Sequence, residues 1–155
     1  MMLAVLILGI VSVLGIDAIA ESEANRRADR AARETVSALR YARTLAMSTG
    51  NPSGVEFDTT LHLVRVYTRI NNVQTWVRNP AASGGNGNLY QIDLVNTREV
   101  AGVALAVSIP TAATNPYDCV FNQLGATTNV GTIIYTYGKS KCVVTIAALA
   151  DPTIN

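Results

Sequence analysis

The N-terminal third of the chain shows one continuous helical pattern. Residues 1 to 16 form an uncharged apolar run whose only polar side chain is Ser12. From Asp17 to Met47 there is no glycine and no proline, and small or apolar residues recur at alternating steps of four and three, the spacing of one helix face. The pattern predicts a single helix of about 47 residues, roughly 70 Å long. Its predicted inner face consists of Ala28, Ala32, Thr35, Leu39, Ala42 and Ala46.

The opposite side of this helix is charged, and the segment from Ser48 to Pro52 ends it. Gly50 is of the type favoured just past a helix end, and Pro52 cannot continue a helix. The pattern indicates a solvated face with a mild basic excess and with several opposite charges at a spacing of four. Its residues are Asp17, Glu21, Glu23, Arg26, Arg27, Asp29, Arg30, Arg33, Glu34, Arg40 and Arg43.

From Gly54 onward the pattern changes to short runs rich in Val, Ile, Thr and Tyr, bounded by Asn, Gly and Pro. Such runs are typical of antiparallel strands. We expect tight turns at Asn71 and Asn72 and around Gly138 to Ser140. The predicted fold class is α+β, a long helix packed on an antiparallel sheet, with boundaries at 1–20, 21–50 and 51–155. The predicted strand segments are 54–58, 61–70, 73–79, 89–95, 100–109, 119–125, 131–138 and 141–149.

Alternation within the first strands assigns side chains to faces. Glu56 and Asp58 alternate with Phe57, so both carboxylates are predicted to point to solvent. In the next strand His62 is placed on the face of Val64, Val66 and Ile70, where a lone histidine is expected to be structural. Arg65 and Arg69 share the opposite face of that strand and are the candidate residues for contact with DNA or a partner protein.

Residues 79 to 88 are rich in Gly, Asn and Ser and predict a mobile loop. A glycine-rich phosphate cradle requires a following helix with Lys-Ser/Thr, whereas this loop leads into a predicted strand. Two interpretations remain, an ordinary surface loop and a contact surface for a partner.

Composition excludes several function classes. The chain has 155 residues, a formal net charge of +1 and 15% charged residues, which suits one domain without a global field to attract nucleic acid. The carboxylates of the sheet half are scattered, and no nucleophile-elbow sequence accompanies the one histidine. We therefore expect no catalytic site, no metal site and no cofactor.

Cys119 and Cys142 are the only cysteines and lie at predicted strand starts. In an exported protein a disulfide between them is predicted to stabilise the fold by about 3 kcal/mol through loop closure. The alternative is a pair of buried free thiols.

The apolar run is short for a membrane span. Sixteen residues of helix extend roughly 24 Å, whereas the hydrocarbon core of a bilayer measures about 30 Å. A cleaved secretory signal ending near Ala18 to Ala20 is an alternative, although no basic residue precedes the run. The candidate residues of the membrane or filament-core helix are Met1, Met2, Leu3, Val5, Leu6, Ile7, Leu8, Gly9, Ile10, Val11, Val13, Leu14 and Ile16.

Three segments resemble type IV pilin-like proteins, in particular the GspH/FimT group of minor pseudopilins. The stretch MMLAVLILGI is similar to the apolar start of these proteins, with Gly9 as their helix glycine. The segment SALRYARTLAMSTGNPSGVEFD resembles the group's junction between helix and first strand, and FNQLGATTNVGTIIYTYGKSKCVVTIAAL resembles its closing strands. The resemblance is weakest from about Pro80 to Pro116.

The family's mature start, typically Phe-Thr-Leu-Ile-Glu, and its basic leader are absent before Met1. Restoring five residues would lengthen the apolar run to about 21 residues, or roughly 31 Å. We therefore expect a start upstream of Met1 or a trimmed chain.

The resemblance implies a structural role. It predicts a minor pseudopilin of a type II secretion system or a type IV pilus, anchored in the bacterial inner membrane with its C-terminal domain in the periplasm. The implied partners are other pilin or pseudopilin subunits, membrane lipid before assembly and an inner-membrane assembly platform. Two alternatives remain, a FimT-like minor pilin that binds DNA and a soluble periplasmic binding domain behind a cleaved signal. Nucleic acid is not expected to be the main partner.

Overall fold

The computed structural model describes residues 2–79, 89–110, 115–127, 129–148 and 151–154, with side chains from Ala20 onward. One helix, α1 (Met2–Thr49), forms the N-terminal third, as the sequence predicts. It ends at Gly50, whose φ is 68° and whose amide donates to the carbonyl of Ala46 at 3.0 Å. Glycine suits this left-handed position because it has no Cβ.

All six positions of the predicted inner face are buried: Ala28, Ala32, Thr35, Leu39, Ala42 and Ala46. Four of them are alanine, and Ala31 and Ala38 are buried beside them. Small side chains let the helix backbone approach the strands closely. The amphipathic half of α1 is therefore part of the hydrophobic core.

The rest of the chain forms two antiparallel sheets, where the sequence predicted antiparallel strands without dividing them. The five-stranded sheet has the order β3-β2-β1-β6, with β4 also paired to β2, and the four-stranded sheet has the order β5-β7-β8-β9. The strands are β1 (Ser53–Asp58), β2 (Leu63–Ile70), β3 (Val73–Trp76), β4 (Gln91–Asp93), β5 (Ala104–Ser108), β6 (Tyr117–Phe121), β7 (Gly131–Tyr137), β8 (Ser140–Ile146) and β9 (Thr153–Ile154).

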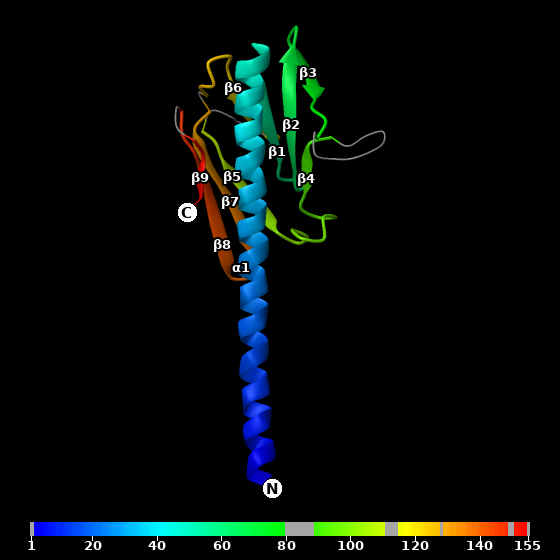
Figure 1. The fold of residues 1–155 in the computed structure, drawn as a ribbon, viewed down its shortest axis with the longest axis vertical. Coiled ribbons are helices and arrows are strands. Elements are labelled where there is room, and N and C mark those ends of the chain that lie inside the picture. Colours follow the sequence, from blue (N-terminus) through cyan, green and yellow to red (C-terminus); the bar gives the residue numbers. More distant parts are fainter. Residues whose placement is uncertain (1, 80–88, 111–114, 128, 149–150, 155) are drawn as a thin grey trace.

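Helix α1 runs along both sheets and joins them into one unit (Figure 1). One hydrophobic cluster contains the inner face of the helix, Val55 and Phe57 of β1, and Ile133 and Val144 of the second sheet. Within this cluster the hydroxyls of Thr35 and Tyr135 form a buried hydrogen bond of 2.5 Å. The bond fixes the helix against β7 and satisfies two polar groups that would otherwise be costly to bury.

Each predicted strand segment overlaps an observed strand, but several of the predicted strand ends are wrong. Asn71 and Asn72 form the β2–β3 turn with φ values of 53° and 64°, as expected for asparagines in a tight hairpin turn. The placement of His62 within a strand was wrong. β2 begins at Leu63, and His62 lies in the preceding turn with a φ of 52°. Ile70, predicted to share the inner face, is exposed because β2 ends there at the hairpin tip.

Candidate functional site

The N-terminal part of α1 extends well beyond both sheets (Figure 1). Among the described side chains, which begin at Ala20, the first buried helix residue is Ala24. The predicted membrane or filament-core segment from Met2 to Ile16 lies in this projecting part as continuous helix, and Met1 lies outside the described residues. Across the described part of the chain, no helix has both the length and the apolarity to cross a membrane.

The second candidate surface is the outer face of the five-stranded sheet, on the side away from α1. Arg65 and Arg69 share this face, as the alternation predicts. The guanidinium of Arg65 lies 4.3 Å from the ring centroid of Trp76, and that of Arg69 lies 5.5 Å from the ring of Tyr67. Each arginine therefore packs on an aromatic ring, which holds it close to the sheet.

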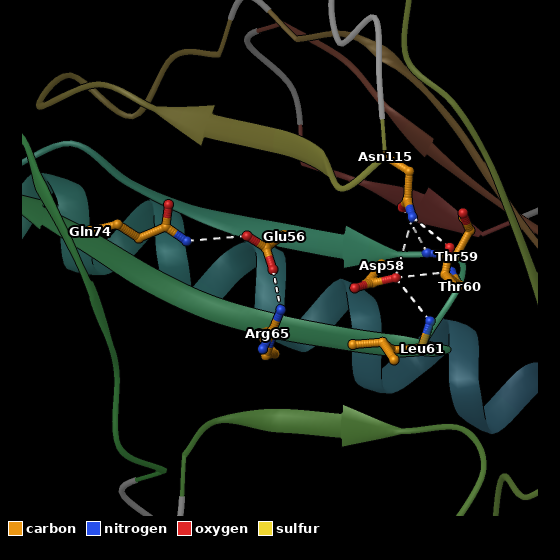
Figure 2. A network of polar contacts seen from close by, with 8 residues as sticks. All are labelled: Glu56, Asp58, Thr59, Thr60, Leu61, Arg65, Gln74 and Asn115. Carbon is orange, nitrogen blue, oxygen red and sulfur yellow. Dashed lines mark hydrogen bonds and ion pairs between the residues drawn. The ribbon is translucent and has the colours of Figure 1, made fainter.

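Each of these arginines also has a carboxylate partner. Arg65 donates to Glu56 at 2.5 Å, and Gln74 donates to the other oxygen of Glu56 at 3.2 Å (Figure 2). Arg69 lies 3.6 Å from a carboxylate oxygen of Asp118. The pairs neutralise the two positive charges, so this face offers phosphate groups little net attraction.

The prediction that Glu56 and Asp58 point to solvent was wrong. They are only 7% and 8% exposed, although both lie on the outer face. The reason is the place of β1 in the sheet. It is an inner strand between β2 and β6, and Arg65 stands opposite Glu56 in register. Arg65 and Gln74 from the neighbouring strands bond to Glu56, whereas the partners of Asp58 are the β1–β2 turn and Asn115.

Asp58 organises the turn between β1 and β2. Its Oδ1 accepts hydrogen bonds from the amides of Thr60 and Leu61, both at 2.9 Å. Asn115, just before β6, donates to Thr60 Oγ1 at 2.8 Å and accepts from the amide of Thr59 at 3.0 Å (Figure 2). The hydrogen bond from Leu61, with smaller contributions from Asn115 and Thr60, lowers the pKa of Asp58 despite its burial.

This lowered pKa predicts a specific acid sensitivity. The stabilisation from ionised Asp58 is present at neutral pH and is lost as the pH falls below about 4, through the lowered pKa. Asp58→Asn keeps an oxygen that can accept the same hydrogen bonds but does not titrate. We expect its urea midpoint, followed by the fluorescence of Trp76, to fall less between pH 7 and pH 3 than that of the unchanged chain. Glu21→Gln, at an exposed position, is the control, and an equal fall in Asp58→Asn would contradict the prediction.

Tyr67 and Asp118 form the least expected part of this outer face. Tyr67 is fully buried although it points away from α1, and burial raises its pKa. Burial and the nearby charge of Glu56 also raise the pKa of Asp118. Sequence reasoning did not single out Tyr67, Gln74, Trp76, Asn115 or Asp118. The signal that could have found them is strand register, since Tyr67 stands opposite Trp76 and Glu56 opposite Asp118.

The predicted disulfide is not formed, since Cys119 and Cys142 are both buried free thiols. Cys119 lies in one sheet, 3.8 Å from Thr127 Oγ1, and Cys142 lies in the other. The amide of Thr127 donates a hydrogen bond to the carbonyl of Ala148, so Cys119 lies near Ala148. Ala148 follows Cys142 along the chain, and an extended segment of this length spans about 20 Å. A disulfide requires Cα atoms within about 7 Å. Burial raises the pKa of Cys119 to about 12, so this thiol is unreactive at neutral pH.

The predicted contact loop from Asn79 to Asn88 is described only at its first residue, and residues 80–88 lie outside the described part of the chain. Asn79 lies beside Tyr90 and the helix residues Arg33 and Ser37 around an open hollow. The role of the loop as a contact surface stays a prediction.

The layout of one long helix, half projecting and half packed on two small sheets, is shared with a solved structure. No protein-family model and no curated protein matches the chain. Among solved structures, it is similar to the minor pseudopilin EpsH from the Type 2 Secretion System of Vibrio cholerae, with a TM-score of 0.62 and 15% sequence identity. The chain has the fold of a minor pseudopilin. The alignment covers 83% of this chain and 96% of the EpsH chain.

Proposed function

We propose that the chain is a minor pseudopilin of a type II secretion system or a related type IV pilus. Residues 1–20 act as membrane anchor and later as filament-core helix, residues 21–50 join this helix to the domain, and residues 51–155 form the domain that faces outward in the periplasm. The work of such a protein is mechanical. It moves from the inner membrane into a filament and contacts other subunits there.

One observation carries this proposal. The helix continues without a break from the core of the domain into the projecting segment that contains the apolar run (Figure 1). A helix in water does not keep such a run exposed, because burying apolar surface stabilises by about 25 cal/mol per Å². Lipid and neighbouring helices are two environments that can cover it, and exchanging one for the other costs little hydrophobic free energy. The likeness to EpsH supports the same interpretation.

Membrane fractionation tests the proposed anchor. We expect the full chain, expressed in bacteria, to stay in the membrane pellet after a carbonate wash at high pH. Leu8→Arg places a charge at the centre of the apolar run, where arginine costs about 2.5 to 3.5 kcal/mol, and should move much of the chain to the wash. Leu8→Ala is the matched control and should remain in the pellet. Recovery of the unchanged chain in the wash would refute the proposed anchor.

The geometry of Arg65 and Arg69 does not favour the DNA-binding alternative. Both guanidinium groups are paired with carboxylates on the same face, so the face lacks the excess of positive charge that supplies most non-specific affinity for DNA. A contact with other subunits agrees better with a face that combines aromatic rings and internally paired charges.

A further inference from the structure

Positive charge without an ion-pair partner gathers at the end of the domain from which α1 projects. The Lys and Arg residues that form no ion pair with a described residue are all exposed: Arg26, Arg40, Arg78, Arg98, Lys139 and Lys141. Arg40 lies about four turns farther along α1 than Arg26, and Arg78 follows β3. We call the other four the basal cations: Arg26, Arg98, Lys139 and Lys141.

Two basal cations lie at the level where the domain begins. Lys139 is in the turn between β7 and β8, and Lys141 is at the start of β8. Figure 1 shows this turn at the end of the two sheets that is nearest the N-terminus. Lys139 lines an open hollow together with Ala20 and Ala24 of α1. Ala20 follows Ile16, the last residue of the apolar run, by only about 6 Å of helix, so Lys139 is held close to the end of the proposed anchor.

Arg26 and Arg98 line a second open hollow, of about 430 Å³, between α1 and the loop that joins β4 to β5. The other arginines of this hollow each form an ion pair with a glutamate that also lines it: Arg27 with Glu23 and Arg30 with Glu99. Because these pairs cancel, the hollow keeps the charges of Arg26 and Arg98 for an incoming anion.

Arg27 connects the β4–β5 loop and the β7–β8 turn to the same level of the helix. It donates a hydrogen bond to the carbonyl of Ala101 at 3.0 Å, and its guanidinium lies 5.1 Å from the ring centroid of Tyr137. Gly102 packs so closely on the same ring that an added Cβ would lie 3.1 Å from it. The segments that carry the basal cations are therefore preformed, and binding an anion requires little further ordering of the chain.

Two acids oppose this charge. Glu21 is exposed, forms no ion pair with a described residue and lines the same hollow as Lys139. Asp17 directly follows the apolar run in the sequence. The basal cations exceed these two acids, so this end of the domain has an excess of positive charge, and its attraction for anions depends on ionic strength.

We propose that the basal cations bind the phosphate groups of anionic phospholipids in the membrane that anchors the chain. The proposal rests on the proposed function, because the anchor is what brings this end of the domain to a membrane surface. The polar layer of one leaflet is about 5 to 8 Å thick, and the helix level beside Lys139 begins about 6 Å beyond the apolar run.

The remaining basal cations are also near enough to respond to lipid charge. Arg26 follows Ile16 by about 15 Å of helix, which places its level about one Debye length above the polar layer at physiological ionic strength. An anionic membrane surface attracts Lys and Arg within that distance. Binding the lipid phosphates holds the domain against the membrane for as long as the chain stays anchored there.

Fluorescence quenching in liposomes tests this contact. The full chain with Val95→Cys, in the exposed loop that carries Arg98, is labelled with a fluorophore, while Cys119 and Cys142 are buried. The liposomes contain a lipid with a nitroxide on its headgroup, in phosphatidylcholine alone or mixed with phosphatidylglycerol. We expect at least about two-fold greater quenching with phosphatidylglycerol, and loss of this difference at about 1 M salt, where the Debye length is about 3 Å. Equal quenching in both lipids would overturn the proposal.

Glutamine variants assign the effect to the basal cations. Replacing all four (Arg26→Gln, Arg98→Gln, Lys139→Gln and Lys141→Gln) should abolish the difference between the two lipids. Arg40→Gln with Arg78→Gln is the matched control, since it removes exposed cations that also lack ion pairs, and it should keep the difference. A difference that survives in the fourfold variant, or is lost equally in the control, would contradict the assignment. The urea midpoint of the fourfold variant should be unchanged, because all four positions are exposed.

The carbonate wash on the same liposomes separates this inference from the proposed function. If the unchanged chain is washed off, the proposed anchor is wrong. If the chain stays in the liposomes but its quenching does not depend on phosphatidylglycerol, the basal cations do not bind lipid phosphate, and the proposed function is unaffected. The fourfold variant should stay in the liposomes like the unchanged chain, because its apolar run is intact.

Discussion

Replacing Phe57 by alanine is expected to lower the free energy of unfolding by about 3–5 kcal/mol, the range for removing a buried aromatic ring. Phe57 is fully buried on the inner face of β1, within the cluster that joins the five-stranded sheet to α1. The helix residues of this cluster are mostly alanine, whose side chains are too short to fill the cavity. Because a domain of this size has only about 5–15 kcal/mol in total, the loss is a large part of its stability.

Urea unfolding of the full chain in detergent measures this effect, with Trp76 as the one tryptophan. Phe57→Leu is the matched control, since it retains most of the apolar volume and should cost less than about 1.5 kcal/mol. Equal midpoints for the alanine and leucine variants would mean that the ring does not contribute to the joint between helix and sheet.

The inner face of α1 could be predicted from the sequence because its cause is local. A helix that packs on one side repeats its small residues every 3.5 positions or so, and Ala28 to Ala46 follow that repeat without exception. The turn at Asn71 and Asn72 was predictable for the same reason, since asparagine tolerates the left-handed conformation that this turn requires.

The polar outer face could not be predicted because its cause is not local. Alternation correctly placed Glu56 on the side away from the core, but alternation says nothing about what covers that side. Coverage depends on the order of strands, which puts Arg65 and Asp118 next to Glu56 in register. The disulfide prediction failed in the same way, because the spacing of Cys119 and Cys142 does not reveal that they belong to different sheets.

Replacing Arg65 by methionine is expected to lower the free energy of unfolding at pH 7 by about 3 kcal/mol, because removing one partner of a buried ion pair leaves the other charge uncompensated. Methionine keeps an apolar stem beside Trp76. Of its partners among the described residues, Glu56 then retains only the hydrogen bond from the Gln74 side chain. We place the effect at the low end of the range of about 3–5 kcal/mol because the side chain of Arg65 is 23% exposed.

Glu56→Gln combined with Arg65→Met should recover much of this loss, because neither of the two positions then carries a charge. Lys141→Met, at an exposed position, is the control and should change stability by less than about 0.5 kcal/mol. Both measurements use the urea midpoint of the full chain in detergent.

The Arg65 variant also distinguishes the two roles considered for this face. If Arg65 holds the sheet together, Arg65→Met loses stability and the double variant regains it. In that case any shift of DNA in a gel is the same for Arg65→Met as for the unchanged chain at every salt concentration. If Arg65 instead binds phosphate, Arg65→Met and the double variant both weaken a salt-dependent shift, and neither differs much from the unchanged chain in stability. The ion pair with Glu56 and the ring of Trp76 lead us to expect the first result.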